Sequence, residues 1–147
     1  MRYDLEFLED YCREIGLVAR ISGRSALEVF FGNGAVLCFQ NADREEDCAV
    51  GFPNTPWDFH GDIKLAWHFH GDIMFADSKG NYVELDILNL LSGIRAGDVV
   101  LCERYRDGTL VDRWLAHSEY NDEFRGLDQN EWLVVRRANA SSIQESL

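Results

Sequence analysis

The chain has 147 residues, of which 46% are apolar and 12% aromatic, and its 26 acidic and 14 basic residues give a net charge of −12. This length and composition exclude a disordered protein and predict one domain with a sizeable core. The excess of acids repels phosphate, which argues against nucleic-acid binding and favours either a basic protein partner or simple solubility.

Four cysteines and the N-terminal residues indicate the compartment. Cys12, Cys38, Cys48 and Cys102 form no C-x-x-C pair, so a zinc ribbon or a thioredoxin motif is excluded. The first 16 residues carry five acids and lack the apolar core of a secretory signal. No apolar run approaches the roughly 20 residues that span a bilayer. We therefore expect a cytoplasmic protein without membrane contact, whose thiols are reduced and buried.

The first third of the chain predicts one helix followed by short strands. Apolar residues at helical spacing indicate a helix over 4–15, which Asp4 begins and Gly16 ends. Strand-forming residues bounded by turn residues then predict four strands: 17–21, 26–31, 35–39 and 48–52. The glycine-rich turn at 32–34 makes the middle two a hairpin. Both prolines of the chain lie in 52–56, which we expect to be extended.

The second half predicts a short helix between strands. Asp86 and Gly97 mark the ends of a helix over 87–96. Strands are expected on both sides of it: 82–85, 99–105, 109–116 and 132–136. The Asp-Gly pair at 107–108 predicts a tight hairpin between the second and third of these. Residues 120–127 favour one or two helical turns.

This order of elements lacks the regular alternation of strand and helix that builds parallel sheets. We predict an α+β fold with a mainly antiparallel sheet of about six to eight strands, an N-terminal helix and one or two short helices. A single domain is expected over 1–137, followed by a frayed tail over 138–147.

A tandem repeat over residues 57–76 is the strongest pattern in the sequence. The segments WDFHGDIKLA and WHFHGDIMFA agree at seven of ten positions. As extended chain, the repeat places its Trp and Phe rings on one face and its imidazoles on the other. Alternatively, turns at each His-Gly-Asp leave strands at 63–69 and 73–77 in a meander.

The repeat contains a candidate metal site. Imidazole and carboxylate ligands together suit Zn, Fe or Mn, and two histidines two residues apart on one strand lie about 6–7 Å apart. The candidate ligands are His60, His68, His70 and Asp72. The simpler interpretation is a duplicated surface segment whose histidines bond to the local backbone.

No catalytic residue can be assigned from the sequence. Paired carboxylates could serve acid–base chemistry, but capping of a turn and of a helix explains Asp77 and Asp86. No nucleophile motif surrounds any cysteine or serine. The thiols are better explained as buried apolar groups.

Acids and aromatics near the C-terminus form a candidate protein-binding segment. Such a mixture suits docking to a basic surface, although a solvated loop with core aromatics explains it as well. The candidate residues are Glu119, Tyr120, Asp122, Glu123 and Phe124.

We therefore expect a small, acidic, cytosolic protein-binding module without a cofactor, similar to a bacterial immunity or antitoxin protein that caps a basic partner. The alternative is a small enzyme that depends on Zn or Mn bound by the His/Asp cluster of residues 60–72. A third possibility is a homo-oligomer formed through an exposed edge of the aromatic repeat.

Overall fold

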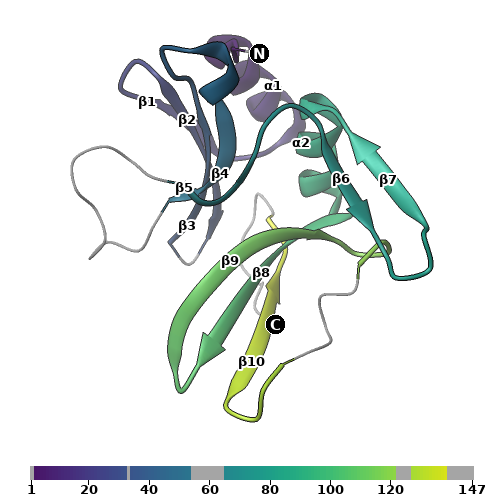
Figure 1. Cartoon of the computed structure of the whole chain (residues 1–147). Coiled ribbons are helices and arrows are strands. Elements are labelled where there is room, and N and C mark those ends of the chain that lie inside the picture. Colours follow the sequence, from purple (N-terminus) through teal and green to yellow (C-terminus); the bar gives the residue numbers. More distant parts are fainter. Residues whose placement is uncertain (1, 33, 54–64, 122–126, 139–147) are drawn as a thin grey trace. The chain divides into compact units, whose positions relative to one another are not determined.

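The computed structural model describes residues 2–32, 34–53, 65–121 and 127–138. These residues form two α-helices, one 3-10 helix and ten strands in three antiparallel sheets (Figure 1). The α+β class is confirmed, with more strands than the six to eight expected. The chain divides into two compact units, Met1–Gly71 and Asp72–Leu147.

Helix α1 (Leu5–Ile15) opens the first unit with the predicted ends. The Asp4 carboxylate accepts a hydrogen bond from the backbone N–H of Phe7, which satisfies one of the free donors of the first turn. Gly16 ends the helix with a φ of 90°, a left-handed conformation that glycine adopts without strain. Helix α1 packs on β1 and β2 through its buried face of Leu5, Leu8 and Cys12.

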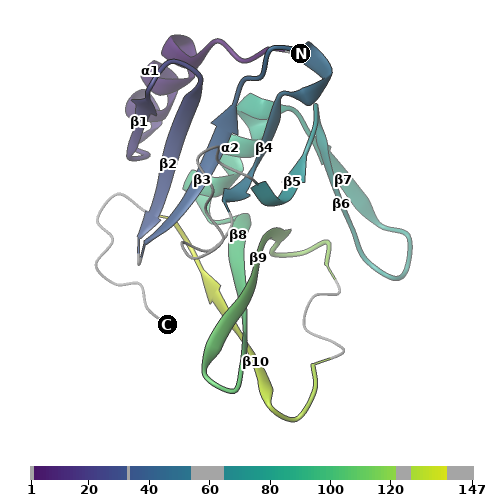
Figure 2. The same cartoon turned by 60° about the vertical axis from the view of Figure 1, so that its left-hand side comes forward.

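The sheet of the first unit contains five antiparallel strands that lie in chain order (Figure 2). They are β1 (Ala19–Ser22), β2 (Ala26–Gly32), β3 (Ala35–Gln40), β4 (Ala49–Pro53) and β5 (Leu65–Phe69). The predicted hairpin of β2 and β3 is confirmed. A short 3-10 helix, η1 (Glu45–Asp47), lies between β3 and β4.

Alternating side chains give this sheet a buried inner face. Its buried residues are Leu27, Val29 and Phe31 on β2, Leu37 and Phe39 on β3, and Val50 and Phe52 on β4. The ring of Tyr3, just before α1, meets Phe39 edge to face at 5.8 Å between centroids. On the outer face, Arg20 pairs with Glu28 at 3.1 Å.

The second unit contains two sheets and one helix. Strands β6 (Ile73–Ala76) and β7 (Tyr82–Leu85) form one sheet. Helix α2 (Ile87–Ala96) follows, and β8 (Val99–Arg106), β9 (Thr109–His117) and β10 (Glu131–Arg136) form the other, in the order β10–β8–β9. Both predicted ends of α2 are confirmed, because Asp86 accepts from the N–H of Asn89 and Gly97 has a φ of 87°.

The core of the second unit lies on both faces of its three-stranded sheet. Helix α2 buries Leu90, Leu91 and Ile94, and a Cβ added at Gly93 would lie 3.0 Å from a methyl of Val99. The other face carries a cluster of Val100, Cys102 and Ala116 with three half-buried residues, Trp114, Leu133 and Val135. The hairpin of β8 and β9 is confirmed, with positive φ at Asp107 and Gly108.

Several predictions fall partly outside the described residues. These are the end of the 52–56 segment, most of the 120–127 segment and the tail from 139. Ala138, assigned to the frayed tail, is buried. The single domain over 1–137 stays a prediction. Cys12, Cys38, Cys48 and Cys102 are all buried free cysteines. Within the described residues, neither α-helix has the length and apolar composition of a membrane-spanning helix.

Candidate functional site

The second copy of the repeat is divided between two strands. Strand β5 ends at Phe69, the chain turns at Gly71 with a φ of 73°, and β6 begins at Ile73. A continuous strand through this copy is therefore wrong, and the turn at His-Gly-Asp is right. The meander is also wrong, because β5 pairs with β4 whereas β6 pairs with β7. Residues 57–64 of the repeat lie outside the described residues.

The predicted orientation of the side chains is confirmed in β5 and just after it. Trp67 and Phe69 are half-buried, and their ring centroids lie 5.8 Å apart. Trp67 also contacts Phe52 of β4 at 5.9 Å. His68 and His70 are exposed. The rings therefore continue the inner face of the sheet, and the imidazoles lie on its outer face.

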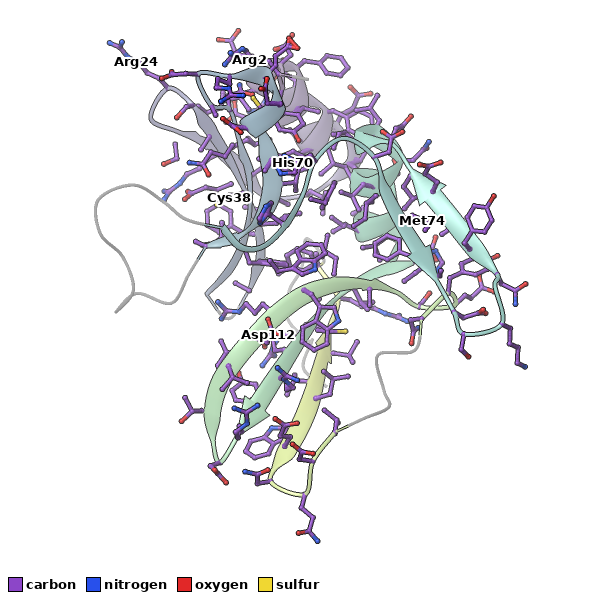
Figure 3. The ribbon with its side chains drawn as sticks, in the orientation of Figure 1. Arg2, Arg24, Cys38, His70, Met74 and Asp112 are labelled. Carbon is purple, nitrogen blue, oxygen red and sulfur yellow. The ribbon has the colours of Figure 1, made fainter. Side chains whose placement is uncertain are left out.

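The two imidazoles lie close together at the end of β5, where Figure 3 labels His70. Their ring centroids are 5.1 Å apart and their planes are nearly perpendicular, at 86°. Nδ1 of His70 lies 2.8 Å from the backbone oxygen of Cys48. Because a carbonyl oxygen only accepts, Nδ1 carries the proton and donates it, which leaves Nε2 of the neutral ring with a free lone pair.

An open cavity of about 310 Å³ adjoins this imidazole pair. Its lining residues come from four segments of the first unit and are Gln40, Asp47, Ala49, His68 and His70. Gln40 of β3 and Ala49 of β4 are register partners, and Asp47 ends η1. The cavity therefore presents two imidazoles, one carboxylate and one amide, which suit a polar ligand, and the imidazoles are of the kind that bind transition metals.

Gly51 gives His68 its place on the sheet. The two residues are register partners on β4 and β5. A Cβ added at Gly51 would lie 2.1 Å from the backbone oxygen of Trp67 and 2.6 Å from Cβ of His68. Only glycine permits so close an approach of the two strands. The role of Gly51 could not be predicted from the sequence, because no neighbouring residue indicates that a glycine will face another strand.

The predicted metal ligands are only partly placed. His68 and His70 are brought together, His60 lies outside the described residues, and Asp72 is exposed at the start of the second unit. Among the described residues, no three His, Cys, Asp or Glu side chains form a group that could hold a metal ion. The four-residue ligand set therefore stays a prediction. Gln40 and Asp47 were missed, because strand pairing alone brings them near the repeat.

The predicted partner-binding segment is also only partly described. Glu119 is exposed, and Tyr120 is half-buried with its ring 5.0 Å from that of His117. Backbone N–H groups of both residues donate to Nδ1 of His117, at 3.0 and 3.4 Å. Buried His117 therefore organises this turn. Asp122, Glu123 and Phe124 lie outside the described residues.

The β6–β7 sheet has an exposed face that no sequence pattern predicted. Met74 is 61% exposed and Tyr82 is 63% exposed. Met74 lies opposite Glu84, and Ala76 lies opposite Tyr82. Glu84 is exposed on this same side, and the exposed acids Asp72 and Asp86 come directly before β6 and directly after β7. This acidic–apolar face, defined as Met74, Tyr82 and Glu84, therefore has two further acids next to it along the chain, and Figure 3 labels Met74 on it.

The buried carboxylates of the second unit are already paired. Glu103 of β8 is 1% exposed and accepts hydrogen bonds from Arg113 at 2.8 Å and Arg136 at 2.6 Å. Glu131 accepts from Arg106 at 2.8 Å and from the N–H of Asp128 at 3.2 Å. The backbone bond, with help from Arg106, lowers the pKa of Glu131. The carboxylates of Glu103 and Glu131 are therefore both engaged by partners within the second unit.

The acids assigned to capping have that role. Asp77 accepts hydrogen bonds from the backbone N–H groups of Lys79 and Asn81. The side chain of Asn81 donates as well and is the main reason that the pKa of Asp77 is lowered. Asp86 caps α2. Nothing in this arrangement pairs the two acids for catalysis.

Two thiols of the first unit, those of Cys12 and Cys38, are poor nucleophiles. Burial raises the pKa of Cys38 to about 11, and the nearby charge of Glu28 adds to the rise. Burial likewise raises the pKa of Cys12 to about 11, with a smaller contribution from Glu9. Both groups therefore stay protonated at neutral pH, whereas a reactive cysteine needs its thiolate.

No family model, no curated protein and no solved structure matches the chain. The function must therefore be inferred from the imidazole pair, the acidic–apolar face and the charge of the chain.

Proposed function

We propose that this protein is a non-enzymatic, cytoplasmic protein-binding module that caps a basic partner, in the manner of an immunity or antitoxin protein. The acidic–apolar face of β6 and β7 supports this proposal most. Met and Tyr side chains are both enriched at protein interfaces, and Tyr buries a large area at a small loss of side-chain entropy. The surrounding acids, within a chain of net charge −12, would attract a basic surface and speed its docking.

Glu119 and Tyr120 provide a second part of the proposed surface. Their turn is held by His117, so a partner would meet a preorganised backbone and lose less entropy on binding. The proposal keeps Asp122, Glu123 and Phe124 as further contacts. It needs no cofactor and involves neither nucleic acid nor membrane.

Pull-down experiments at low and high salt test this proposal. The tagged full chain should recover a basic protein from the source cells at about 50 mM salt and lose much of it near 1 M, where the screening length falls to about 3 Å. Tyr82→Ala should weaken the complex about 30-fold, as expected for an interface residue worth about 2 kcal/mol. Val111→Ala, at an exposed position on β9, is the matched control and should leave binding unchanged.

Recovery of no salt-sensitive protein would overturn the proposal. If the partner instead proves to be a second copy of this chain, the homo-oligomer becomes the better account. Sedimentation of the purified protein distinguishes these two outcomes.

The second candidate is a small metal-dependent enzyme that uses the cluster of residues 60–72, with Zn or Mn as the expected metal. The proximity of His68 and His70 to an open polar cavity favours it. Elemental analysis of the protein purified without chelators tests it. This candidate requires stoichiometric Zn or Mn, and a metal-free protein whose melting temperature does not rise on addition of either metal would exclude it.

A further inference from the structure

We propose that His68 and His70 form a binding site for a divalent transition-metal ion on the outer face of the first unit, with the adjoining cavity holding the remaining ligands as water. This inference deepens the second candidate function and rests on the same imidazoles. Metal binding at this site does not require that the protein catalyse a reaction. Failure of the partner-binding proposal would not affect it, because metal binding and partner binding involve different surfaces and are tested by different measurements.

The spacing of the rings suits one shared ion. Two imidazoles bound to one tetrahedral metal place their ring centroids about 5 Å apart, because each metal–nitrogen bond is about 2.0–2.1 Å long. The centroids of His68 and His70 are 5.1 Å apart before any ion is present. Little movement of the backbone would therefore be needed to bring both nitrogens to a metal.

His70 already has the hydrogen bond that a ligating histidine usually makes. Its Nδ1–H donates to the oxygen of Cys48 at 2.8 Å, which selects the tautomer and orients the ring. Metal-bound histidines generally use their second nitrogen in this way, with a carboxylate or a backbone carbonyl as acceptor. The bond leaves Nε2 of His70 as the ligand atom.

His68 is held by the sheet itself. Gly51 lies opposite it and lets β5 approach β4 closely, and the neighbouring residue Trp67 packs against Phe52 on the inner face. A site on a paired strand is more rigid than a site on a loop, so binding costs less ordering entropy.

The cavity supplies space, charge and selectivity. Asp47, whose carboxylate also lies 3.8 Å from the guanidinium of Arg44, places a negative charge on its wall, and Gln40 adds an amide for hydrogen bonds to metal-bound water. Imidazole ligands favour Cu²⁺, Ni²⁺ and Zn²⁺ and disfavour Mg²⁺, which prefers oxygen. The expected order of affinity is Cu²⁺ above Ni²⁺ and Zn²⁺, with Mg²⁺ far below.

Isothermal titration of the full chain with NiCl₂, ZnCl₂ and MgCl₂ tests the site. We expect saturable 1:1 binding of Ni²⁺ and Zn²⁺ and none of Mg²⁺. His68→Ala and His70→Ala should each weaken binding at least tenfold, because even groups that only orient a metal ligand contribute about 10–100-fold. The proposal is overturned if the wild-type chain binds neither metal with a dissociation constant below about 1 mM, or if either variant keeps wild-type affinity.

A pair of acid variants tests the place of the ion. Asp47→Asn should weaken binding about two- to fivefold, as expected for one unit charge that acts through water. Glu46→Gln is the matched control, since Glu46 is the preceding residue of η1 and does not line the cavity. Equal losses for both variants would indicate general attraction to the acidic surface and would contradict the site. Far-UV circular dichroism confirms that each variant is folded.

Discussion

The two units of the chain differ in whether the ionisable side chains of their sheets are exposed or buried. In the first unit the buried positions of the sheet are apolar, aromatic or thiol, and the imidazoles of His68 and His70 are exposed. In the second unit the sheet buries two carboxylates, Glu103 and Glu131, and pairs each with arginine. A buried charge is tolerated only when hydrogen-bonded partners replace its water.

This difference separates structural groups from functional candidates. The hydrogen bonds of Glu103 and Glu131 are made within the sheet, so neither acid is available to a ligand. His70 uses one ring nitrogen for the backbone and keeps the other for solvent. Among the described residues, the candidates for ligand binding therefore include the exposed side chains beside the cavity of the first unit and those on the acidic–apolar face of the second.

Removal of the most buried charge should have the largest effect on stability. Glu103→Ala should lower the free energy of unfolding by about 3 kcal/mol, because it removes the carboxylate that pairs with both Arg113 and Arg136 in a largely buried site. Urea denaturation measures this loss. The expected decrease in the free energy of unfolding is near the lower end of the cost of breaking a buried ion pair. The reason is that about a fifth of each arginine side chain is exposed.

Asp112→Ala is the matched control on the same sheet. Its pair with Arg104 is longer, at 3.5 Å, and both side chains are at least one-third exposed. The loss should stay below about 1 kcal/mol. Equal losses in the two variants would show that burial does not distinguish the two pairs.

Disruption of the contact between β4 and β5 should have the next largest effect. Gly51→Ala should lower the free energy of unfolding by about 1–3 kcal/mol, because its methyl group meets the backbone of Trp67 and Cβ of His68. The same variant should weaken the binding of Ni²⁺. Unchanged stability in urea denaturation would mean that β5 does not pair with β4 as described.

Alkaline pH should destabilise the protein, because two buried thiols of the first unit resist deprotonation in the folded state. Burial raises the pKa of Cys12 and Cys38 to about 11, so the folded state keeps protons that the unfolded chain releases above about pH 9. Stability should therefore fall as the pH rises from 9 toward 11, by on the order of 1 kcal/mol at pH 9.5. Urea midpoints at pH 8 and 9.5 measure this. A smaller dependence is expected for Cys38→Ala, and an identical one would contradict the assignment.

Loss of either helix cap should likewise have a modest effect. Asp86→Ala and Asp4→Ala each remove a carboxylate that accepts one backbone N–H, and each should cost about 0.5–2 kcal/mol. One cap belongs to each unit, so similar losses are expected. Thermal melts of both variants check this, and a cost above about 3 kcal/mol for either would show a role beyond capping.

The features that the sequence predicted correctly are those that depend on residues close together in the chain. The ends of both helices follow from Asp4, Gly16, Asp86 and Gly97, and the hairpin at 107–108 follows from its Asp-Gly pair. The alternation of Trp67 and Phe69 with His68 and His70 was also readable, because it depends only on the pleat of a strand.

The features that the sequence did not predict depend on contacts between distant segments. The two halves of the second repeat copy belong to different sheets. No local sequence pattern predicts which strand will pair with which. Glu103 meets Arg113 and Arg136 only after three strands have paired. The cavity beside the imidazoles likewise forms only when β3, η1, β4 and β5 come together. Gln40 and Asp47 could therefore not be recognised as lining residues from the sequence around them.

Paramagnetic broadening by Cu²⁺ in the amide spectrum of the ¹⁵N-labelled full chain tests the central claim most directly, namely that the imidazole pair and its cavity form one outward-facing site. We predict that the amides of Ala49, His68 and His70 lose intensity first, at substoichiometric Cu²⁺, and that His68→Ala abolishes this early loss. Early broadening centred instead on the turn around His117, or spread evenly over the acidic surface, would contradict it.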